Sequence, residues 1–298
     1  MGGGRQMKKT ASQVKSVLEA GRFLIPYRIY ENDGPHIVCV NGVQQSMAMW
    51  QSFISRFSRK YRIVLFDFPN QGKARIVSGP EQVSLNEQIE ILKAVLDQTG
   101  TGVDATLCAA SWGGVVAVGF AAMHSARIQR LVLASLGTKP NRKMVETIEK
   151  AVAVDVKNRA KMAEILLKSF GQDLPLSVKR KIIGQFHAMK EERLRAFFEH
   201  GLFVIASKSL SEVVNLQNIK AKTILLNGEK DTIIDLEDVK VLSSQIPDCE
   251  MIVVKGVGHF LHLEDAGVLD IYETILSPGV GPEFPALHRQ EYGSYPLT

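Results

Sequence analysis

One stretch, residues 105–120, constrains the fold of this chain more than any other. It reads as a short apolar strand, a sharp turn at Ser111 and a helix rich in small residues. A strand that reverses directly into a helix leaves no space for bulk two positions either side of the turn, and Ala109 and Gly113 occupy those positions. This pattern is typical of a nucleophile elbow, which exposes a serine hydroxyl at the edge of a sheet. The alternative is a serine that only caps a helix.

The composition is that of an ordinary globular protein. Of 298 residues, 45% are hydrophobic and 22% are charged, which argues against a disordered chain and allows a large core. No apolar run reaches the roughly 18 residues of a membrane span, and no signal peptide is recognisable. We therefore expect a cytoplasmic protein. The three cysteines (Cys39, Cys108 and Cys249) are widely spaced and lack metal-ligand spacing. We expect no metal and no cofactor.

Strand-like and helical segments alternate on both sides of the elbow. We expect strands at residues 22–30, 36–40, 61–66, 105–109, 128–134, 223–226 and 251–254, and helices at residues 49–57, 85–96, 236–244 and 263–276. Such alternation predicts an α/β fold in which a mostly parallel sheet of the eight-stranded type is covered by helices on both faces. Residues 22–137 and 220–276 form this predicted core.

The alternation stops between the two parts of the core. Residues 138–219 show helical periodicity without a convincing strand, which predicts a helical lid over the turn at Ser111. Four of its aromatic residues are candidates for an apolar substrate pocket: Phe170, Phe186, Phe197 and Phe198. The alternative is that these rings pack the helices of the lid against one another.

The lid also carries the positive charge of the chain. Between Lys139 and His200 there are 14 Lys or Arg residues against 8 Asp or Glu residues, so the rest of a chain of net charge +5 is close to neutral. A basic lid could receive an acidic acyl-carrier protein or the phosphates of coenzyme A. The alternative is a set of solvated helix faces. No accompanying motif indicates binding of nucleic acid.

The two ends of the chain are predicted to lie outside the core. Residues 1–21 read as a basic N-terminal helical extension, because Val14, Val17 and Leu18 fall on one helical face among lysines. Residues 277–298 are rich in proline and glycine and are expected to form a C-terminal tail.

Three polar residues follow strands in the order Ser111, Asp231 and His259. Because parallel strands end at one edge of a sheet, we expect these side chains to meet there. A serine hydroxyl needs a base, and His259 would take its proton while Asp231 orients the imidazole. The sequence therefore predicts a catalytic triad.

Backbone N–H groups complete this prediction. The N–H groups of Val43, after a strand, and of Trp112, at the start of a helix, are the candidate oxyanion hole. Competing candidates for the triad acid are Asp235, Glu237 and Asp238, which lie further into the next helix, and His262 competes with His259. Asp67, followed by Pro69 and Gly72, is expected to form a turn.

Several motifs resemble the α/β-hydrolase fold family over nearly the whole chain. They are Val40-Asn41-Gly42, Val64-Leu65-Phe66-Asp67-Phe68-Pro69, Ala110-Ser111-Trp112-Gly113-Gly114, Asn227-Gly228-Glu229-Lys230-Asp231, Glu237-Asp238 and Gly258-His259-Phe260-Leu261-His262-Leu263-Glu264. Within that superfamily the chain is most similar to bacterial acyltransferases of two related kinds. One is the β-hydroxyacyl-carrier-protein:coenzyme A transacylase, and the other is the hydroxyalkanoyloxy-alkanoate synthase of rhamnolipid precursor formation.

The resemblance implies an acyltransferase that uses a β-hydroxyacyl thioester, on carrier protein or coenzyme A, and a hydroxyl or thiol acceptor. The thioester would be the substrate, with no further cofactor. A second hypothesis is a carboxylic ester or thioester hydrolase, since transfer and hydrolysis share every catalytic residue. A third is a non-catalytic binding protein of the same fold, which the complete Ser-Asp-His set disfavours.

Overall fold

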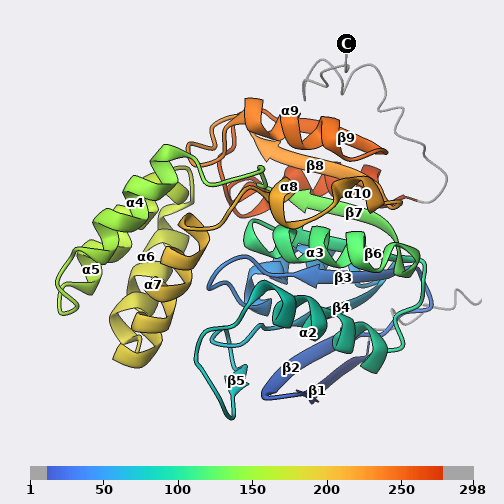
Figure 1. Ribbon diagram of the computed structural model, residues 1–298, viewed down its shortest axis with the longest axis horizontal. Coiled ribbons are helices and arrows are strands. Elements are labelled where there is room, and N and C mark those ends of the chain that lie inside the picture. Colours follow the sequence, from blue (N-terminus) through green and yellow to red (C-terminus); the bar gives the residue numbers. More distant parts are fainter. Residues whose placement is uncertain (1–11, 278–298) are drawn as a thin grey trace, which may run out of the picture.

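A single mixed sheet organises the computed structural model, which describes residues 12–277 (Figure 1). Its path is β1-β2-β4-β3-β6-β7-β8-β9, and β5 pairs with β2. The strands are β1 (Gln13–Ala20), β2 (Phe23–Tyr30), β3 (His36–Val40), β4 (Arg62–Phe66), β5 (Arg75–Ile76), β6 (Ala105–Ala110), β7 (Ile128–Ala134), β8 (Lys222–Gly228) and β9 (Cys249–Val254). Neighbouring strands are parallel along the path β4-β3-β6-β7-β8-β9, whereas β2 pairs antiparallel with β1, β4 and β5. The predicted fold class is confirmed.

Helices cover both faces of the sheet. They are α1 (Gln51–Phe57), α2 (Leu85–Gln98), α3 (Trp112–Met123), α4 (Arg142–Val152), α5 (Arg159–Phe170), α6 (Leu176–Ala188), α7 (Glu191–Ile205), α8 (Leu210–Val213), α9 (Leu236–Gln245) and α10 (Val268–Leu276). Short 3₁₀ turns are η1 (Met47–Trp50), η2 (Ser125–Arg127), η3 (Leu216–Asn218) and η4 (Leu261–Leu263). Apolar residues of α2, α3 and α9 pack on one face, and those of α1 and α10 pack on the other.

The alternation of side chains along each strand supplies these two faces. In β3, Val38 and Val40 point into the core shared with α2, α3 and α9, whereas Ile37 and Cys39 point toward α1 and α10. All four side chains are essentially inaccessible to solvent. Burying one large apolar side chain stabilises a fold by roughly 1.5–3 kcal/mol, so a sheet filled on both faces holds its strand ends rigidly.

The cysteines contribute to this core as thiols. Cys39 and Cys108 are free, fully buried and paired in register on neighbouring strands, while Cys249 is only partly buried. Burial raises the pKa of the Cys39 and Cys108 thiols well above their ordinary value. Since the thiolate is the reactive form, neither is suited to act as a nucleophile.

A helical insertion, residues 138–219, separates β7 from β8. Its helices α4 to α7 stand beyond the carboxyl ends of the strands, to one side of the sheet (Figure 1). Two acidic residues of the core hold its first segment. Asp238 accepts a hydrogen bond from the Thr138 N–H (2.5 Å), and Asp235 accepts one from the Asn141 amide (2.8 Å). The insertion is therefore fixed to the sheet where it begins.

The N-terminal prediction is wrong where the structure tests it. Residues Gln13–Ala20 form strand β1, which pairs antiparallel with β2 along its whole length, and not a helix. Gly21, at a φ of +59°, provides the tight turn between the two strands. The rest of the predicted extension (residues 1–11) and residues 278–298 of the predicted tail lie outside the described residues. Within residues 12–277 no helix has both the length and the apolar composition to cross a membrane.

Candidate active site

The backbone at Ser111 has the strained geometry of an elbow. Its φ of 50° and ψ of −123° lie outside the regions that L-residues favour. The turn is held because the Ser111 N–H donates to the Ala134 carbonyl (2.8 Å) and the Gly114 N–H donates to the Ser111 carbonyl (2.7 Å). A Cβ atom at Gly113 would lie 2.4 Å from the Asn41 carbonyl oxygen, so only glycine fits there. The small residue at position 113 therefore has the steric cause expected from the sequence.

Asp231 and His259 form the central contact of the site. The Asp231 Oδ2 atom lies 2.8 Å from His259 Nδ1, and the two side chains are 0% and 4% exposed. The other oxygen, Asp231 Oδ1, accepts hydrogen bonds from the N–H groups of Ile233 (3.0 Å) and Ile234 (3.2 Å). This carboxylate is thus fixed in one orientation and can hold the imidazole in one tautomer.

The loop that carries His259 is supported from two sides. The Ser135 hydroxyl donates to the His259 carbonyl (2.6 Å), and Glu264 accepts from the N–H groups of Gly258 (2.5 Å) and Phe260 (3.0 Å). Burial raises the pKa of Glu264. Ser135 lies outside the motifs around the predicted triad, and Glu264 ends the motif 258–264, but neither pattern indicated these hydrogen bonds.

Ser111 and His259 line the same small recess, with a volume of about 20 Å³. Within residues 12–277, no hydrogen bond joins the Ser111 hydroxyl to the His259 imidazole. Such catalytic hydrogen bonds commonly tighten only when substrate is bound. The structure therefore brings the three predicted residues to one edge of the sheet, with the Asp231–His259 pair already assembled.

The competing acidic residues and histidine have other contacts. Asp235 and Asp238 hold the helical insertion, and Glu237 forms an exposed ion pair with a neighbouring lysine. His262 is buried and stacks on Trp50, with ring centroids 5.7 Å apart, and burial lowers its pKa. Within the described residues, none of these four side chains forms a hydrogen bond with Asp231 or His259.

The loop after β3 contains the second candidate oxyanion donor. Asn41 is fully buried at its start and donates to the Phe66 carbonyl (2.8 Å), while the Trp50 indole donates to its side-chain oxygen (2.8 Å). Within residues 12–277 neither the Val43 N–H nor the Trp112 N–H donates a hydrogen bond. Both groups remain free to bind an oxyanion, and their predicted role stays a prediction.

Asp67 supports the same loop from the end of β4. Its Oδ1 atom accepts from the Met47 N–H (2.7 Å) and the Asn41 amide (3.2 Å), and its Oδ2 atom accepts from the Lys73 N–H (3.4 Å). Burial raises the pKa of this carboxyl. Asp67 therefore holds two turns together, in agreement with the structural role expected for it.

An apolar cavity of about 250 Å³ opens at Ser111, and we call it the acyl pocket. Its lining combines core helices, the start of the insertion and α7. Besides Ser111 and Trp112 the lining includes Leu85, Val115, Leu136, Met144, Phe203, Val204, Leu210, Val213 and Ile234. Lys139 and Lys208 also line it. The cavity has space and an apolar lining for a hydrocarbon chain beside Ser111, and the two lysines place positive charge in its lining.

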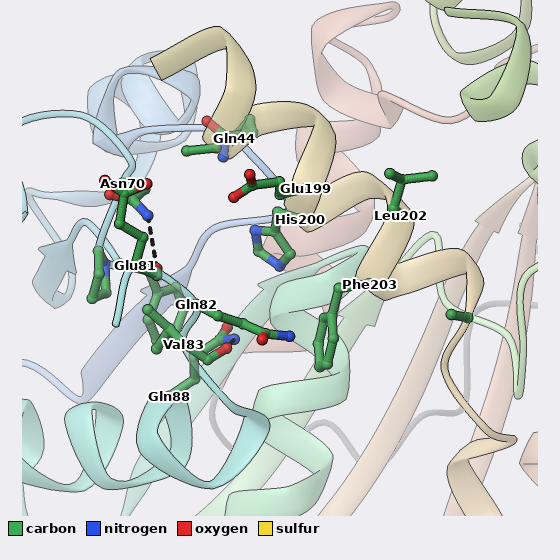
Figure 2. Close-up of a pocket in the computed structure, with 14 residues that line it drawn as sticks. Gln44, Asn70, Glu81, Gln82, Val83, Gln88, Glu199, His200, Leu202 and Phe203 are labelled. Carbon is green, nitrogen blue, oxygen red and sulfur yellow. Dashed lines mark hydrogen bonds between the residues drawn. The ribbon is translucent and has the colours of Figure 1, made fainter. Parts of the chain in front are cut away.

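A second cavity, of about 470 Å³, lies between α7 and the loops of the core, and we call it the polar pocket (Figure 2). Its polar lining residues are Gln44, Asn70, Glu81, Gln82, Gln88, Glu199 and His200. Phe203 lines both cavities and therefore separates them. No sequence motif indicates this pocket, because its residues come from four separate segments of the chain.

The four aromatic candidates of the insertion differ in position. The ring of Phe170 packs edge-on against the His259 imidazole, with centroids 5.7 Å apart. Phe186, Phe197 and Phe198 instead pack against one another within the insertion, and they line none of the three cavities. The contacts of these three rings favour the alternative, in which they pack the helices of the insertion against one another.

The fold and the site together define a class of protein. The family model of the alpha/beta hydrolase fold matches residues 35–266, so the chain belongs to this family. It is an enzyme of the serine hydrolase and acyltransferase class. The match spans the turn at Ser111, the helical insertion and His259, the last residue of the predicted triad.

Relatives of known activity are distant but match most of the chain. A protein of Pseudomonas putida named (R)-3-hydroxydecanoyl-ACP:CoA transacylase is 21% identical over 250 residues, covering 82% of this chain and 83% of its own length. A pimeloyl-[acyl-carrier protein] methyl ester esterase of Nitrosospira multiformis is 24% identical over 257 residues, covering 80% of this chain and 94% of its own length.

Solved structures show the same fold. The carboxylesterase CesB of Bacillus subtilis superposes with a TM-score of 0.72 at 19% identity, covering 90% of this chain and 93% of that chain. The esterase EaEST of Exiguobacterium antarcticum gives 0.74 at 16% identity, covering 89% of this chain and 100% of that chain.

Proposed function

We propose that this enzyme transfers an acyl group from a β-hydroxyacyl thioester, carried by acyl-carrier protein or coenzyme A, to a hydroxyl or thiol acceptor. The observation that supports the proposal is the assembled Asp231–His259 pair, which shares a recess with Ser111 next to the acyl pocket. The relative named as a transacylase supports this choice of substrate. A cytoplasmic location is part of the proposal.

The reaction would proceed in two steps through an ester on Ser111. In the first, His259 takes the Ser111 proton as the oxygen attacks the thioester carbonyl, and the imidazolium returns that proton to the departing thiol. In the second, His259 takes the proton of the acceptor O–H or S–H, which attacks the ester, and returns it to Ser111. Asp231 stabilises the imidazolium in both steps. No cofactor takes part.

The two free N–H groups would stabilise the oxyanion of each step. The Trp112 N–H lies at the start of α3, where the partial positive charge of a helix favours an anion. The Val43 N–H lies in the loop that Asn41 and Asp67 hold. One donor of this kind typically lowers the barrier by roughly 3–4 kcal/mol.

The acyl pocket would hold the acyl chain. Its apolar lining suits a hydrocarbon, and Lys139 and Lys208 would attract the phosphate of a pantetheine carrier. The excess of positive charge in the helical insertion would in the same way favour docking of an acidic carrier protein.

A hydrolase of esters or thioesters is the second candidate, and the relative named as an esterase favours it. Both reactions pass through the same ester on Ser111 and differ only in whether the acceptor or water attacks it. The non-catalytic alternative has no support from the fold family or the geometry.

The distinguishing experiment gives purified enzyme 3-hydroxydecanoyl-coenzyme A together with a pantetheine thiol or a hydroxy ester as acceptor. The proposal predicts a new thioester or ester that depends on Ser111, measured by liquid chromatography and mass spectrometry. Formation of free acid alone at every acceptor concentration would reject transfer and favour hydrolysis. An inactive enzyme with every thioester and ester tested would contradict both.

A further inference from the structure

The polar pocket is separated from the nucleophile by a single layer of side chains. The Trp112 indole lines the acyl pocket on one side and donates through Nε1 to Gln88 Oε1 (2.9 Å), which lines the polar pocket on the other. The rings of His200 and Phe203 both pack on this indole, with centroids 5.7 and 5.5 Å away. Gln44 directly follows Val43, the candidate oxyanion donor. The polar pocket thus begins next to the reacting centre.

Two residues that line the pocket each have a buried side-chain nitrogen with no hydrogen-bond partner within the described residues. These atoms are Nε2 of Gln44 and Nε2 of His200. A buried polar group without a hydrogen bond is costly, so each one needs an explanation, and a bound ligand is one such explanation. Burial lowers the pKa of His200 to about 4, so its imidazole is neutral near pH 7. The inner end of the pocket therefore offers uncharged hydrogen-bonding groups.

The outer part of the pocket has an acidic character. Exposed Glu81 and Glu199 line it, and no lysine or arginine does so among residues 12–277. Figure 2 shows Glu199 and His200 extending from α7 toward the loop that carries Asn70. The acyl pocket differs, because its lining includes two lysines. An anion would meet repulsion at the entrance of the polar pocket and find no cation inside it.

We infer that the polar pocket is the acceptor site, and that it selects an uncharged alcohol, such as the hydroxyl group of a hydroxy ester, over a hydroxy acid in its carboxylate form. The inference rests on the proposed acyl transfer through Ser111. Gln44 and His200 hydrogen-bond the polar groups of the acceptor, and the apolar wall of Phe68, Leu202 and Phe203 contacts its carbon chain. Phe203 lies between the two pockets, so its side chain must move aside, or the acceptor must extend past it, for the acceptor oxygen to reach the Ser111 ester.

The test measures how the acyl-enzyme divides between water and added acceptors. The donor is 4-nitrophenyl decanoate, and the acceptors are methyl 3-hydroxybutyrate and the 3-hydroxybutyrate anion. The ratio of product ester to decanoic acid, obtained by mass spectrometry, does not depend on how fast Ser111 is acylated. We expect the neutral acceptor to be used about tenfold better than the anion, since each exposed charge contributes roughly a two- to fivefold effect.

Variants connect this preference to the pocket. Glu81→Gln combined with Glu199→Gln should bring the two acceptors to within about threefold of each other. The matched control Glu90→Gln, exposed on α2 outside the pocket, should keep the wild-type preference. His200→Leu should lower transfer to the neutral ester, relative to hydrolysis, by about fivefold because a hydrogen bond is lost.

Three results would overturn the inference. One is an equal use of the two acceptors by the wild-type enzyme, and another is a product ratio that His200→Leu does not change. The third is a wild-type preference for the neutral ester that the combined Glu81→Gln and Glu199→Gln variant retains. If neither 4-nitrophenyl decanoate nor 3-hydroxydecanoyl-coenzyme A acylates the enzyme, the proposed function itself fails, whereas acylation with no selectivity between acceptors rejects only the acceptor site.

Discussion

The Asp231 carboxylate lies 2.8 Å from His259 Nδ1 in a contact almost completely closed to solvent. The two residues are 28 positions apart and follow neighbouring strands, β8 and β9. Because Asp231 is also bound by two backbone N–H groups, the contact is positioned by the sheet and the turn after it. In the proposed reaction, this contact would orient His259 as the base.

Asp231→Asn should lower kcat for 4-nitrophenyl ester turnover by about 10⁴-fold, because an amide that donates to Nδ1 favours the wrong imidazole tautomer. The fold should persist, as judged by circular dichroism. Asp235→Asn is the matched control, since Asp235 contacts the insertion and not His259. It should cost less than about tenfold, and a larger loss than that of Asp231→Asn would reassign the acid.

Gly113→Ala should lower the free energy of unfolding by about 3 kcal/mol, because the added Cβ atom would lie 2.4 Å from the Asn41 carbonyl and 2.6 Å from that of Val40. Urea denaturation measures the change. The control Gly184→Ala, in helix α6 with open space around it, should instead raise stability by about 0.5–1 kcal/mol. Similar effects at both positions would argue against the elbow geometry.

The stability of the enzyme should fall in mild acid partly because of His200. Its pKa is lowered by burial from 6.5 to about 4, so the unfolded chain takes up the proton first. The contribution of neutral His200 to the free energy of unfolding is fully present above pH 6.5 and is lost as the pH falls toward 4. Between pH 8 and pH 5 the loss amounts to about 2 kcal/mol. His200→Phe should remove this part of the pH dependence of the free energy of unfolding, measured by urea denaturation at several pH values. His187→Phe, at an exposed site of α6, should keep it, and equal slopes for His200→Phe and the wild type would contradict this origin.

The positive charge of the helical insertion should matter for a carrier protein and not for a small ester. The test changes three residues of α6 together to glutamate: Lys179, Arg180 and Lys181. The KM for an acyl-carrier-protein substrate should rise about tenfold at low ionic strength, and less at high salt. The KM for a 4-nitrophenyl ester should not change. Lys220→Glu, on the core, is the control. An unchanged KM for the carrier substrate would contradict docking on α6 and would show that these residues form only a solvated surface.

The sequence predicted the parts of the fold whose periodicity is strong. The strands β3, β4 and β6 to β9 and helices such as α2 were located to within a few residues, because buried parallel strands and amphipathic helices have distinct patterns, whereas the two-residue strand β5 was not predicted. Strand β1 was mistaken for a helix. Its side chains are mostly exposed, so no clear alternation marks it, and only pairing with β2 makes it a strand.

In the candidate site, too, the residues with a local sequence pattern could be predicted and those without one could not. Motifs near Ser111, Asp231 and His259 are local, so the sequence could suggest all three. The groups that hold and surround them come from distant segments, as in the contacts of Ser135 with the His259 loop and of Gln88 with Trp112. Neither contact has a sequence signature, and aromatic content alone could not separate Phe170, beside His259, from the rings that pack inside the insertion.

The most direct test of the account is to look for the acyl group on Ser111. Enzyme mixed with 3-hydroxydecanoyl-coenzyme A, quenched in acid and digested, should yield the peptide containing Ser111 with a mass increase of one hydroxydecanoyl group. Ser111→Ala should show neither this adduct nor turnover. Continued turnover by Ser111→Ala, or an acyl group attached to a different residue, would contradict the account.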